Sequence, residues 1–312
     1  MSALGLEVWR LRSIPGVADL YAAERRDDPT RRVEFIDALD PGIPRERKWV
    51  GMVSTQFGCC VGCAMCDAGE RRFRGNVPAE DILEQVRRIL GAHPGTDPRA
   101  VAMFKLHFAR MGEPTFNPGV LEAIETLALG GALPGLVPSV STVAPDCPVS
   151  VDFLERLYRL KERFFRKGRF QLQFSVHTTD PVQRRALIPI RTWSLERMGA
   201  FARRWVRPGD RKVTLNFVSS PSLLVDPQAL ARACSPDACL VKLTPTHPTR
   251  RGARNGLVDD WTEAPERVRE RARDFTAAGF RVIVNAPWPE ETAGGVSCGQ
   301  VAASVATARV PA

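Results

Sequence analysis

The chain reads Gln56-Phe57-Gly58-Cys59-Cys60-Val61-Gly62-Cys63-Ala64-Met65-Cys66 at the point that decides its fold. Cys59, Cys63 and Cys66 stand in the spacing C-x3-C-x2-C. Three thiolates on one short loop can hold three irons of a cubane cluster, which leaves the fourth iron without a protein ligand. An iron with an open position can bind a small molecule and pass it an electron, so the spacing predicts chemistry rather than simple electron storage.

Two structural interpretations of these cysteines compete with the cluster. Free cysteine often packs as a small buried hydrophobe, and two cysteines can form a disulfide. Glycines at 58 and 62 indicate a loop, however, and loops carry function more often than cores do. Structural zinc usually takes four ligands, often from two distant C-x2-C pairs, and the sequence has no such second pair. The spacing therefore favours the cluster.

Length and composition indicate a soluble globular protein. The 312 residues suffice for one large α/β barrel or two ordinary domains, and 44% of them are hydrophobic and 25% charged. No run approaches the length of a membrane span, and the first residues lack a signal-peptide core. We therefore expect a cytoplasmic protein with no membrane contact. The eight cysteines are then expected to be reduced, as an oxygen-sensitive cluster requires.

The charge balance is basic. A net charge of +9, with 44 Lys and Arg residues, favours anionic partners, nucleic acid among them. A solvated basic surface is the alternative. No dense basic block with interleaved aromatic residues is present, so charge alone does not decide between the two.

Strand-like and helix-like segments alternate from residue 49 onward. The pattern predicts parallel strands joined by right-handed βαβ connections. About six or seven units are present, fewer than the eight of a closed barrel, so we expect an α/β fold with a partial (β/α)6 TIM-like barrel. Its active site should lie at the carboxyl ends of the strands, beside the cysteine loop. The expected strands are 49–55, 101–108, 137–143, 170–176, 213–218, 240–243 and 281–284, and the expected helices are 78–90, 117–129, 151–165, 194–205, 227–233, 263–278 and 298–308.

The chain divides into two parts of unequal size. Residues 1–45 are polar, rich in arginine and broken by prolines, and only 33–36 alternates like a short strand. We interpret them as an N-terminal lead-in that is too short for a core of its own. Residues 46–312 then form the barrel, which ends in a Cys-Gly-Gln segment.

Several short motifs together resemble the RlmN/Cfr family of the radical S-adenosylmethionine (SAM) superfamily, whose members methylate adenine carbons in RNA. They occur in the order of the family and cover roughly residues 33–305. The motifs are Val53-Ser54-Thr55-Gln56-Phe57-Gly58-Cys59 (similar to V-S-S-Q-V-G-C), Arg110-Met111-Gly112-Glu113-Pro114 (G-M-G-E-P), Ser141-Thr142 (S-T-S-G), Ser175-Val176-His177 (S-L-H), Leu243-Thr244-Pro245-Thr246-His247-Pro248 (L-I-P-x-N-P) and Cys298-Gly299-Gln300 (C-G-Q).

The resemblance implies two cofactors, a [4Fe-4S] cluster and SAM. Cys59, Cys63 and Cys66 would hold the cluster, and the amino and carboxylate groups of SAM would chelate the open iron. A carboxylate at Glu113 suits the SAM ammonium, because charge-assisted hydrogen bonds are the stronger kind. Taken alone, Gly112-Glu113-Pro114 would be an ordinary strand-to-helix turn. The residues implied at the SAM site are Gly112, Glu113, Ser141, Ser175, Val176, His177 and His247.

The resemblance also implies two catalytic residues. Cys298 would accept a methyl group from one SAM, and the radical made from a second SAM would activate that methyl group for addition to the substrate. Sulfur is nucleophilic once deprotonated, which suits the first step. Glu34 would be a proton acceptor. The structural alternatives are a buried cysteine at 298 and an exposed surface glutamate at 34.

The chain departs from the family at several positions. Met52 stands where the family has a second cysteine that helps to release product, and the additional Cys60 might replace it. His247 replaces an asparagine, and Asn216 stands where a glutamate is expected. The N-terminal accessory domain that helps to hold RNA appears absent. Cys147, Cys234 and Cys239 are expected to be structural.

Three functions remain open. The first is carbon methylation of a nucleobase or small heterocycle through Cys298, with flavodoxin or ferredoxin as the reducing partner. The second is an RNA methyltransferase with a reduced RNA-binding region, in which Arg184-Arg185 and Arg250-Arg251 near the motif loops would meet phosphates. The third is a non-catalytic iron–sulfur or regulatory protein.

Overall fold

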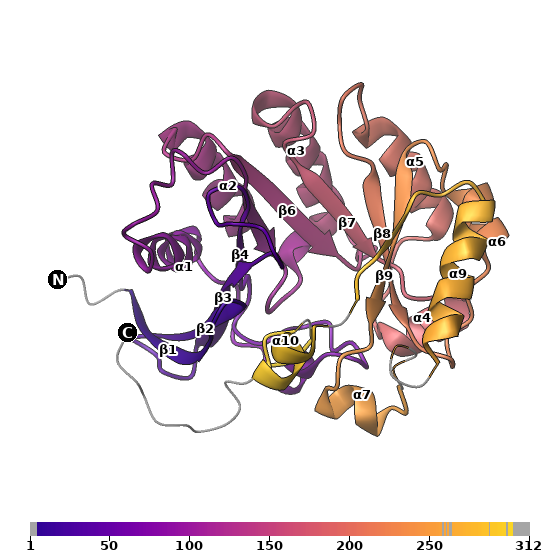
Figure 1. The fold of residues 1–312 in the computed structure, drawn as a ribbon, viewed down its shortest axis with the longest axis horizontal. Coiled ribbons are helices and arrows are strands. Elements are labelled where there is room, and N and C mark those ends of the chain that lie inside the picture. Colours follow the sequence, from indigo (N-terminus) through magenta and orange to yellow (C-terminus); the bar gives the residue numbers. More distant parts are fainter. Residues whose placement is uncertain are drawn as a thin grey trace.

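One curved sheet runs through the whole molecule, with each strand beside the one that follows it in the chain (Figure 1). The computed structural model describes residues 5–257, 259, 261, 264–286, 288–297 and 299–301. Within them β1 to β4 pair antiparallel, and β4 to β10 pair parallel. The strands are β1 (Leu6–Ile14), β2 (Ala18–Arg25), β3 (Arg32–Leu39), β4 (Trp49–Val53), β5 (Phe104–Phe108), β6 (Leu136–Thr142), β7 (Gln171–Ser175), β8 (Val213–Ser219), β9 (Cys239–Pro245) and β10 (Val282–Val284).

Helices cover the outer side of the parallel part of this sheet (Figure 1). Two 3-10 turns, Asp67–Glu70 and Pro114–Phe116, follow β4 and β5 at the carboxyl edge. The helices are α1 (Ala79–Gly91), α2 (Gly119–Gly130), α3 (Pro148–Phe164), α4 (Pro181–Leu187), α5 (Leu195–Trp205), α6 (Pro227–Ala233), α7 (Arg250–Arg254), α9 (Pro265–Ala277) and α10 (Pro289–Gly294). None of the described helices is both long enough and apolar enough to cross a lipid bilayer.

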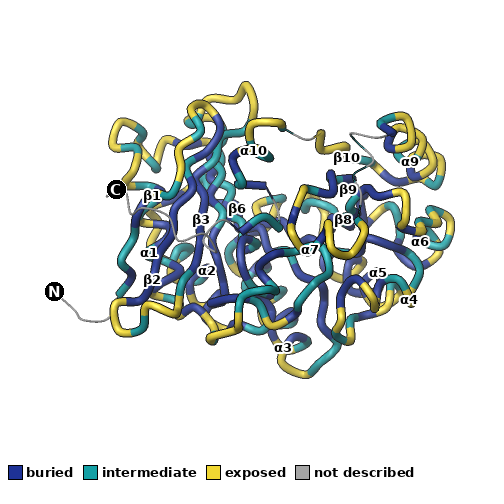
Figure 2. The backbone as a smooth tube through the Cα atoms, turned by 90° about the horizontal axis from the view of Figure 1, so that it is seen from below, coloured by how far each residue is buried: buried dark blue, intermediate teal, exposed yellow. Residues whose placement is uncertain are grey.

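The two faces of the parallel strands differ in chemistry. On β5, Phe104, Leu106 and Phe108 are buried in the main hydrophobic core under the helices. Successive side chains of a strand point to opposite faces, so Lys105 and His107 face the concave interior. The burial pattern in Figure 2 follows this arrangement, with buried strands surrounded by helices that are exposed on their outer side.

The predicted partial barrel is confirmed. Every strand expected from residue 49 onward, and every expected helix up to residue 278, is present with ends within three residues of the prediction. The short helices α4, α7 and α10 were not predicted. Each has at most seven residues, which is too few for a helical period to show. The expected helix 298–308 lies outside the described residues, apart from 299–301.

The prediction for residues 1–45 was wrong in its secondary structure. Three strands are present where one was expected, and they extend the sheet by antiparallel pairing. The reason is that β2 and β3 are buried on both faces, which hides the alternation of apolar and polar residues. Tyr21 and Phe35 join the main core, whereas Leu20 and Ile36 join a second apolar cluster on the other face with Val296. The domain boundary at residue 45 stays a prediction, although the sheet continues across it.

Candidate active site

The cysteine loop, residues 54–66, leaves the carboxyl end of β4 and rests on the loop that follows β5. Thr55 and Gln56 each donate a backbone hydrogen bond to the Met111 carbonyl, at 2.8 and 3.1 Å. Gly58 has a φ of +82°, and a Cβ there would stand 2.6 Å from the Arg72 carbonyl oxygen. Only glycine suits this turn, which directs the chain into the cysteines.

The three cysteine thiols lie close enough to influence one another. All three are free and half-buried. Burial raises the pKa of Cys59 to about 11, and burial followed by the charges of Cys66 and Cys59 raises the pKa of Cys63 well above its ordinary value. Three thiolates in such a site need a cationic partner, because each desolvated negative charge is unfavourable alone.

The spacing of the sulfur atoms fits a cluster better than a single ion. Ligand atoms of one tetrahedral zinc stand about 3.8 Å apart, given zinc–sulfur bonds of about 2.3 Å. In the described structure, the three sulfur atoms do not all lie within 4.8 Å of one another. A cubane binds each thiolate to a different iron and so spreads the sulfur atoms further apart. Cys59, Cys63 and Cys66 therefore fit the group that the spacing predicts.

A set of contacts from the far end of the chain clamps the cysteine loop. Thr249 Oγ1 donates to the Met65 carbonyl at 2.9 Å, Arg251 donates to the Gly62 carbonyl at 2.9 Å, and Asn255 donates to the Ala64 carbonyl at 3.0 Å. These residues belong to α7 and its caps. Sequence reasoning missed them because the partners are more than 180 residues apart and no local pattern marks them.

Gly112 lies in close contact with the cysteine loop. A Cβ at this position would stand 2.6 Å from Cβ and Cγ of Gln56. The Gln56 side chain accepts a hydrogen bond from Glu113 N at 3.1 Å and donates to Asn76 Oδ1 at 2.9 Å. The two family-like motifs, separated by a whole βα unit, are therefore packed directly against each other.

Glu113 is buried beside the cysteines, and its carboxylate ties β5 to β6. Oε1 accepts hydrogen bonds from Thr115 N, Thr115 Oγ1 and Thr142 Oγ1 at 3.1, 2.8 and 2.6 Å, whereas Oε2 accepts one bond, from Val143 N at 2.9 Å. Burial raises the pKa of Glu113, and these hydrogen bonds offset part of that effect. Oε2 retains a lone pair for one further donor, so the geometry fits an ammonium group at this oxygen.

The other residues implied at the SAM site lie on the carboxyl ends of neighbouring strands. Ser141 and Ser175 are half-buried and face the interior from β6 and β7. Val176 and His177 both donate their backbone N–H to the Asn216 carbonyl, at 2.9 and 3.1 Å. The structure thus brings these four residues to the same edge as the cysteine loop.

His177 and His247 are both held in the neutral form. Burial, with Arg184 nearby, lowers the pKa of His177 to about 3, and its Nδ1 accepts a hydrogen bond from Val218 N at 3.3 Å. His177 also has a φ of +67°, an uncommon conformation for a non-glycine residue that often marks functional loops. Burial followed by Lys242 lowers the pKa of His247 to about 4. His247 follows β9 and lies half-buried.

Glu34 is fully buried in an ion pair. Its Oε2 accepts a hydrogen bond from Arg110 Nη2 at 2.8 Å, and both side chains are at most 1% exposed. The alternative of an exposed surface glutamate is therefore wrong. The proton-acceptor role stays a prediction, and the arginine partner stands where the family motif has glycine.

The same arginine holds the C-terminal segment, here residues 295–297 and 299–301. Arg110 donates to the carbonyl oxygens of Gly295, Val296 and Ser297 at 3.2, 3.2 and 2.9 Å. Cys298 lies outside the described residues. Its described neighbour Gly299 accepts a hydrogen bond from Asp67 N at 2.9 Å, and a Cβ at 299 would stand 3.1 Å from the Met65 carbonyl oxygen. Both flanks of position 298 are thus fixed next to the cysteine loop.

Met52 and Cys60 occupy different surroundings. Met52 packs against the apolar cluster that contains Val296 of the C-terminal segment. Cys60 is exposed, and its sulfur lies 3.5 Å from Gln56 Oε1. The position of the missing second cysteine is therefore the one that adjoins the C-terminal segment, as a role in product release requires.

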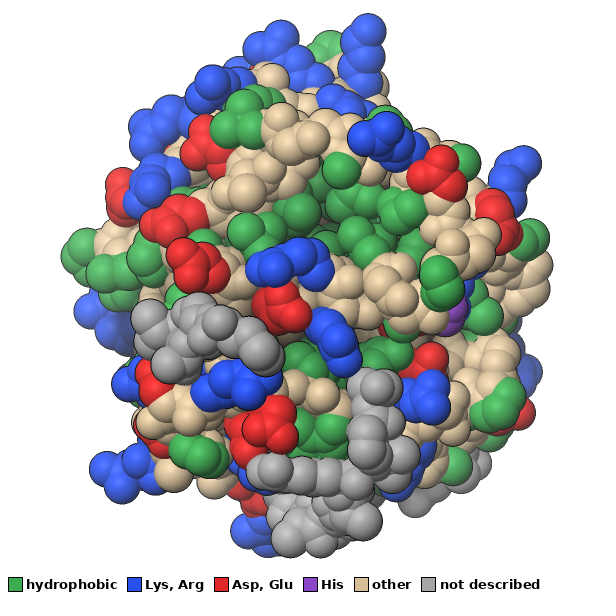
Figure 3. Space-filling view, turned by 90° about the vertical axis from the view of Figure 1, so that its left-hand side faces the viewer, with side chains coloured by type: hydrophobic (Ala, Val, Ile, Leu, Met, Phe, Trp, Pro, Cys, Tyr) green, Lys and Arg blue, Asp and Glu red, His purple; other side chains and the backbone are tan. Residues whose placement is uncertain are grey.

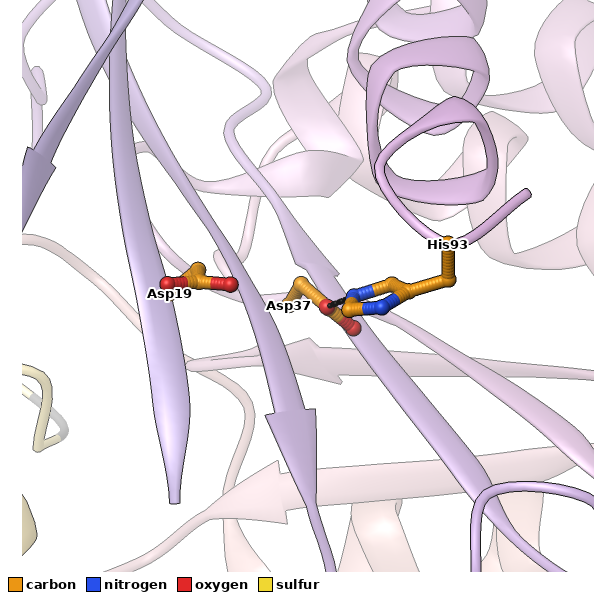
Figure 4. A group of neighbouring side chains, drawn as sticks. All are labelled: Asp19, Asp37 and His93. Atoms are coloured by element: carbon orange, nitrogen blue, oxygen red, sulfur yellow. Dashed lines mark hydrogen bonds and ion pairs between the residues drawn. The ribbon is translucent and has the colours of Figure 1, made fainter. Parts of the chain in front are cut away.

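A second group with metal-ligand chemistry lies far from the cysteines. Asp19 of β2, Asp37 of β3 and His93 after α1 bring their ligand atoms within 4.8 Å of one another (Figure 4). Asp37 is already saturated: Oδ1 accepts from Arg45 at 2.8 Å and from Trp49 Nε1 at 2.5 Å, and Oδ2 pairs with His93. This arrangement is a buried polar network that joins β2, β3 and α1, and its donors occupy the lone pairs that an ion would need.

The basic pairs near the motif loops serve the fold. Arg184 is buried and donates to the carbonyl oxygens of Trp193, Val143 and Ser175. Arg251 donates to the cysteine loop, as described above. These two arginines are therefore engaged within the protein, contrary to the expectation that they face an RNA.

Comparison with known proteins assigns the family. No protein-family model matches the chain. A protein of Sorangium cellulosum named as a probable RNA methyltransferase is 30% identical over 70% of the chain and 54% of its own length. A Synechococcus protein named as a probable dual-specificity RNA methyltransferase RlmN is 27% identical over 98% of the chain and 86% of its own length. The chain thus spans about half of the first relative and most of the second. The chain is a radical SAM protein of the RlmN/Cfr-like group.

A solved structure agrees with this assignment at the level of the fold. The crystal structure of a radical SAM methyltransferase from Sphaerobacter thermophilus matches 97% of the chain and 82% of its own chain, with a TM-score of 0.70 and 23% identity. The cofactors of this RlmN/Cfr-like protein are a [4Fe-4S] cluster and SAM, as the motifs implied. Which residues hold them in this chain rests on the geometry above.

Replacing a cluster cysteine should remove the iron, whereas replacing its neighbour should not. We expect Cys63→Ser to lower the iron bound after anaerobic reconstitution at least fivefold, because two remaining thiolates hold a cubane poorly. Cys60→Ser is the matched control, since Cys60 lies in the same loop and is exposed. Iron and sulfide analysis with the visible absorption spectrum provides the measurement. Full iron content in Cys63→Ser would contradict the ligand assignment.

Breaking the Arg110–Glu34 pair from one side should be more damaging than removing both charges. Arg110→Met leaves the Glu34 carboxylate buried without its partner, which costs about 3–5 kcal/mol in the free energy of unfolding. The double variant Arg110→Met/Glu34→Gln should lose less than Arg110→Met alone. Urea unfolding at equal cluster loading measures both. Additive losses in the double variant would show that the two side chains are not coupled.

Proposed function

We propose that the chain is a radical SAM methyltransferase that methylates a carbon atom of a nucleobase or a small heterocycle through Cys298. The observation that carries this proposal is the docking of the C-terminal segment on the cysteine loop. Gly299 accepts a hydrogen bond from Asp67, the residue directly after Cys66, and Arg110 holds the carbonyl of Ser297. A merely structural cysteine would not need both of its flanks fastened to the cluster loop.

The cofactors supply an electron and a sulfonium group, so that SAM serves as both the methyl donor and the source of a 5'-deoxyadenosyl radical. The chain supplies ligands and positions. Cys59, Cys63 and Cys66 would hold three irons, and Glu113 Oε2 would accept a hydrogen bond from the SAM ammonium group. Ser141, Ser175, Val176, His177 and His247 would line the remainder of the cofactor site. The thiolate of Cys298 would take the methyl group, with a new sulfur–carbon bond formed as the sulfonium bond breaks.

The surroundings of position 298 exclude water from the flanking backbone. Val296 and Ser297 are buried, and Arg110 and Glu34 below them are closed to solvent. A dry, fixed backbone limits the movements of a sulfur-bound methyl group and protects a radical from side reactions. The electron would come from a small reducing partner such as flavodoxin or ferredoxin.

A second candidate function is methylation of RNA. The names of the two relatives favour it. Against it, Arg184 and Arg251 are engaged inside the protein, and on the face shown in Figure 3 the Lys and Arg side chains are interspersed with acidic ones. Salt-sensitive binding of tRNA or ribosomal RNA fragments, well above binding of a random acidic polymer, would support it. A non-catalytic iron–sulfur protein, the third candidate, would form no 5'-deoxyadenosine from SAM and reductant.

Methyl-labelled SAM tests the role of Cys298. We expect the reconstituted protein to carry one labelled methyl group on the peptide that contains Cys298, and Cys298→Ala to carry none. Cys147→Ala is the control, because Cys147 caps α3 away from the cysteine loop. Peptide mass spectrometry gives the readout. An unmodified Cys298 peptide in protein that holds its cluster and cleaves SAM would rule out methyl transfer by this route.

A further inference from the structure

The interior of the partial barrel is polar. On the central strands the inward-facing side chains satisfy one another: Gln173 donates to Ser139 Oγ at 3.2 Å, and Gln171 donates to Thr214 Oγ1 at 2.8 Å. A barrel interior filled for stability alone would instead carry branched apolar side chains. The polar lining therefore suits a space that meets water or a polar ligand.

Two inward-facing residues of β5 differ from this pattern. Lys105 and His107 are half-buried, and neither makes a hydrogen bond or an ion pair within the described residues. Their neighbours on the same strand, Phe104, Leu106 and Phe108, are all turned to the core. The two side chains are thus held on one face of a rigid strand with their polar ends available.

A third basic residue approaches from the opposite side of the barrel. Lys242 lies on β9 between the core residues Val241 and Leu243, so it also faces the interior. Lys242 is the strongest charged influence on Lys105, and both lysines act on His107. Its neighbour in register on β8, Asn216, has a buried Oδ1 that lacks a hydrogen-bond partner among the described residues.

The balance of charge around these residues is positive. Burial, then Lys242, Lys48 and Arg211, lowers the pKa of Lys105 to about 7, and Asp40 alone acts in the opposite sense. Asp40 is itself paired with Lys48. Glu291 faces Lys242, and burial raises the pKa of Glu291. A dianion placed between the basic groups would relieve both the burial and the mutual repulsion.

We propose that Lys105, His107 and Lys242 bind the phosphate group of a small phosphorylated heterocycle, such as a nucleoside monophosphate, that the enzyme modifies. This inference rests on the proposed function and names its substrate class. A phosphate offers three acceptor oxygens and up to two negative charges, which matches three donors that converge from β5 and β9. Strands rise about 3.3 Å per residue, so Lys105 lies about 10 Å below the carboxyl end of β5. A phosphate held there leaves the attached ring directed toward the cofactor edge.

The position inside the barrel favours a small molecule over a nucleic acid. A phosphate within an RNA chain continues in both directions and needs an open groove on either side. Lys105 is instead enclosed by neighbouring parallel strands, β4 and β6, that pair with β5 along its length. A terminal phosphate can enter such a space, whereas an internal phosphodiester would meet these walls.

Binding of AMP and adenosine tests the site, because the two molecules differ only in the phosphate. Isothermal titration would use protein with its cluster, saturating SAM and no reductant, so that the cofactor site is filled. We expect AMP to bind at least tenfold more tightly than adenosine, and this advantage to shrink with added salt. In Lys105→Met and in Lys242→Met, AMP should lose at least tenfold in affinity and adenosine should lose nothing. Lys105→Arg should retain most of the AMP affinity.

Lys167→Met is the matched control, since Lys167 is exposed in the turn between α3 and β7 and loses the same charge. Equal affinity for AMP and adenosine, or equal AMP affinity in Lys105→Met and Lys167→Met, would overturn the site. A 5'-phosphorylated decanucleotide that binds as tightly as AMP, and is lost in the same variants, would overturn the small-molecule assignment in favour of an RNA end. SAM cleavage is assayed separately. AMP binding without cleavage would contradict the proposed function alone, and cleavage without a preference for AMP would contradict this site alone.

Discussion

Three thiolates of one short loop have to stay apart while they face a common centre, and the architecture around residues 54–66 meets this requirement. Left to itself, such a loop would collapse into a disulfide or a small apolar cluster. Here the β5 loop supports its beginning through the Met111 carbonyl, and α7 holds its middle and end through Thr249 and Arg251. The loop thus gains its shape from contacts outside itself. The bound cluster adds the cationic charge that the buried sulfur atoms lack.

The same constraint explains why widely separated motifs belong together. Gly112 is glycine because Gln56 of the cysteine loop fills the space where a Cβ would stand. Glu113 spends three hydrogen bonds of Oε1 on Thr115 and Thr142 and keeps capacity on Oε2, so a single carboxylate both fastens β5 to β6 and can meet a cation. The outer faces of the strands are apolar and packed under helices, and the inner faces are polar. Chemistry is therefore confined to the concave side, and stability is provided by the convex side.

Much of the barrel could be read from the sequence, because buried parallel strands are short apolar runs and their covering helices have a clear period. The cluster ligands were found from spacing alone. The strands of residues 6–39 were missed, since a strand covered on both faces by Tyr21 and Leu20 shows no alternation. The Arg110–Glu34 pair was also missed as a unit, because its members lie 76 residues apart and each looks like a surface residue in isolation. The clamp from α7 has the same origin, as contacts of high sequence separation leave no local signature.

The central claim is that the cluster has one iron free for the amino group of SAM. The most direct measurement is electron–nuclear double resonance of the reduced cluster with SAM labelled with nitrogen-15 at the amino group. The account predicts a hyperfine coupling between that nitrogen and the spin of the cluster, absent when unlabelled SAM is used. A reduced cluster that binds SAM but shows no coupling to the label would contradict it.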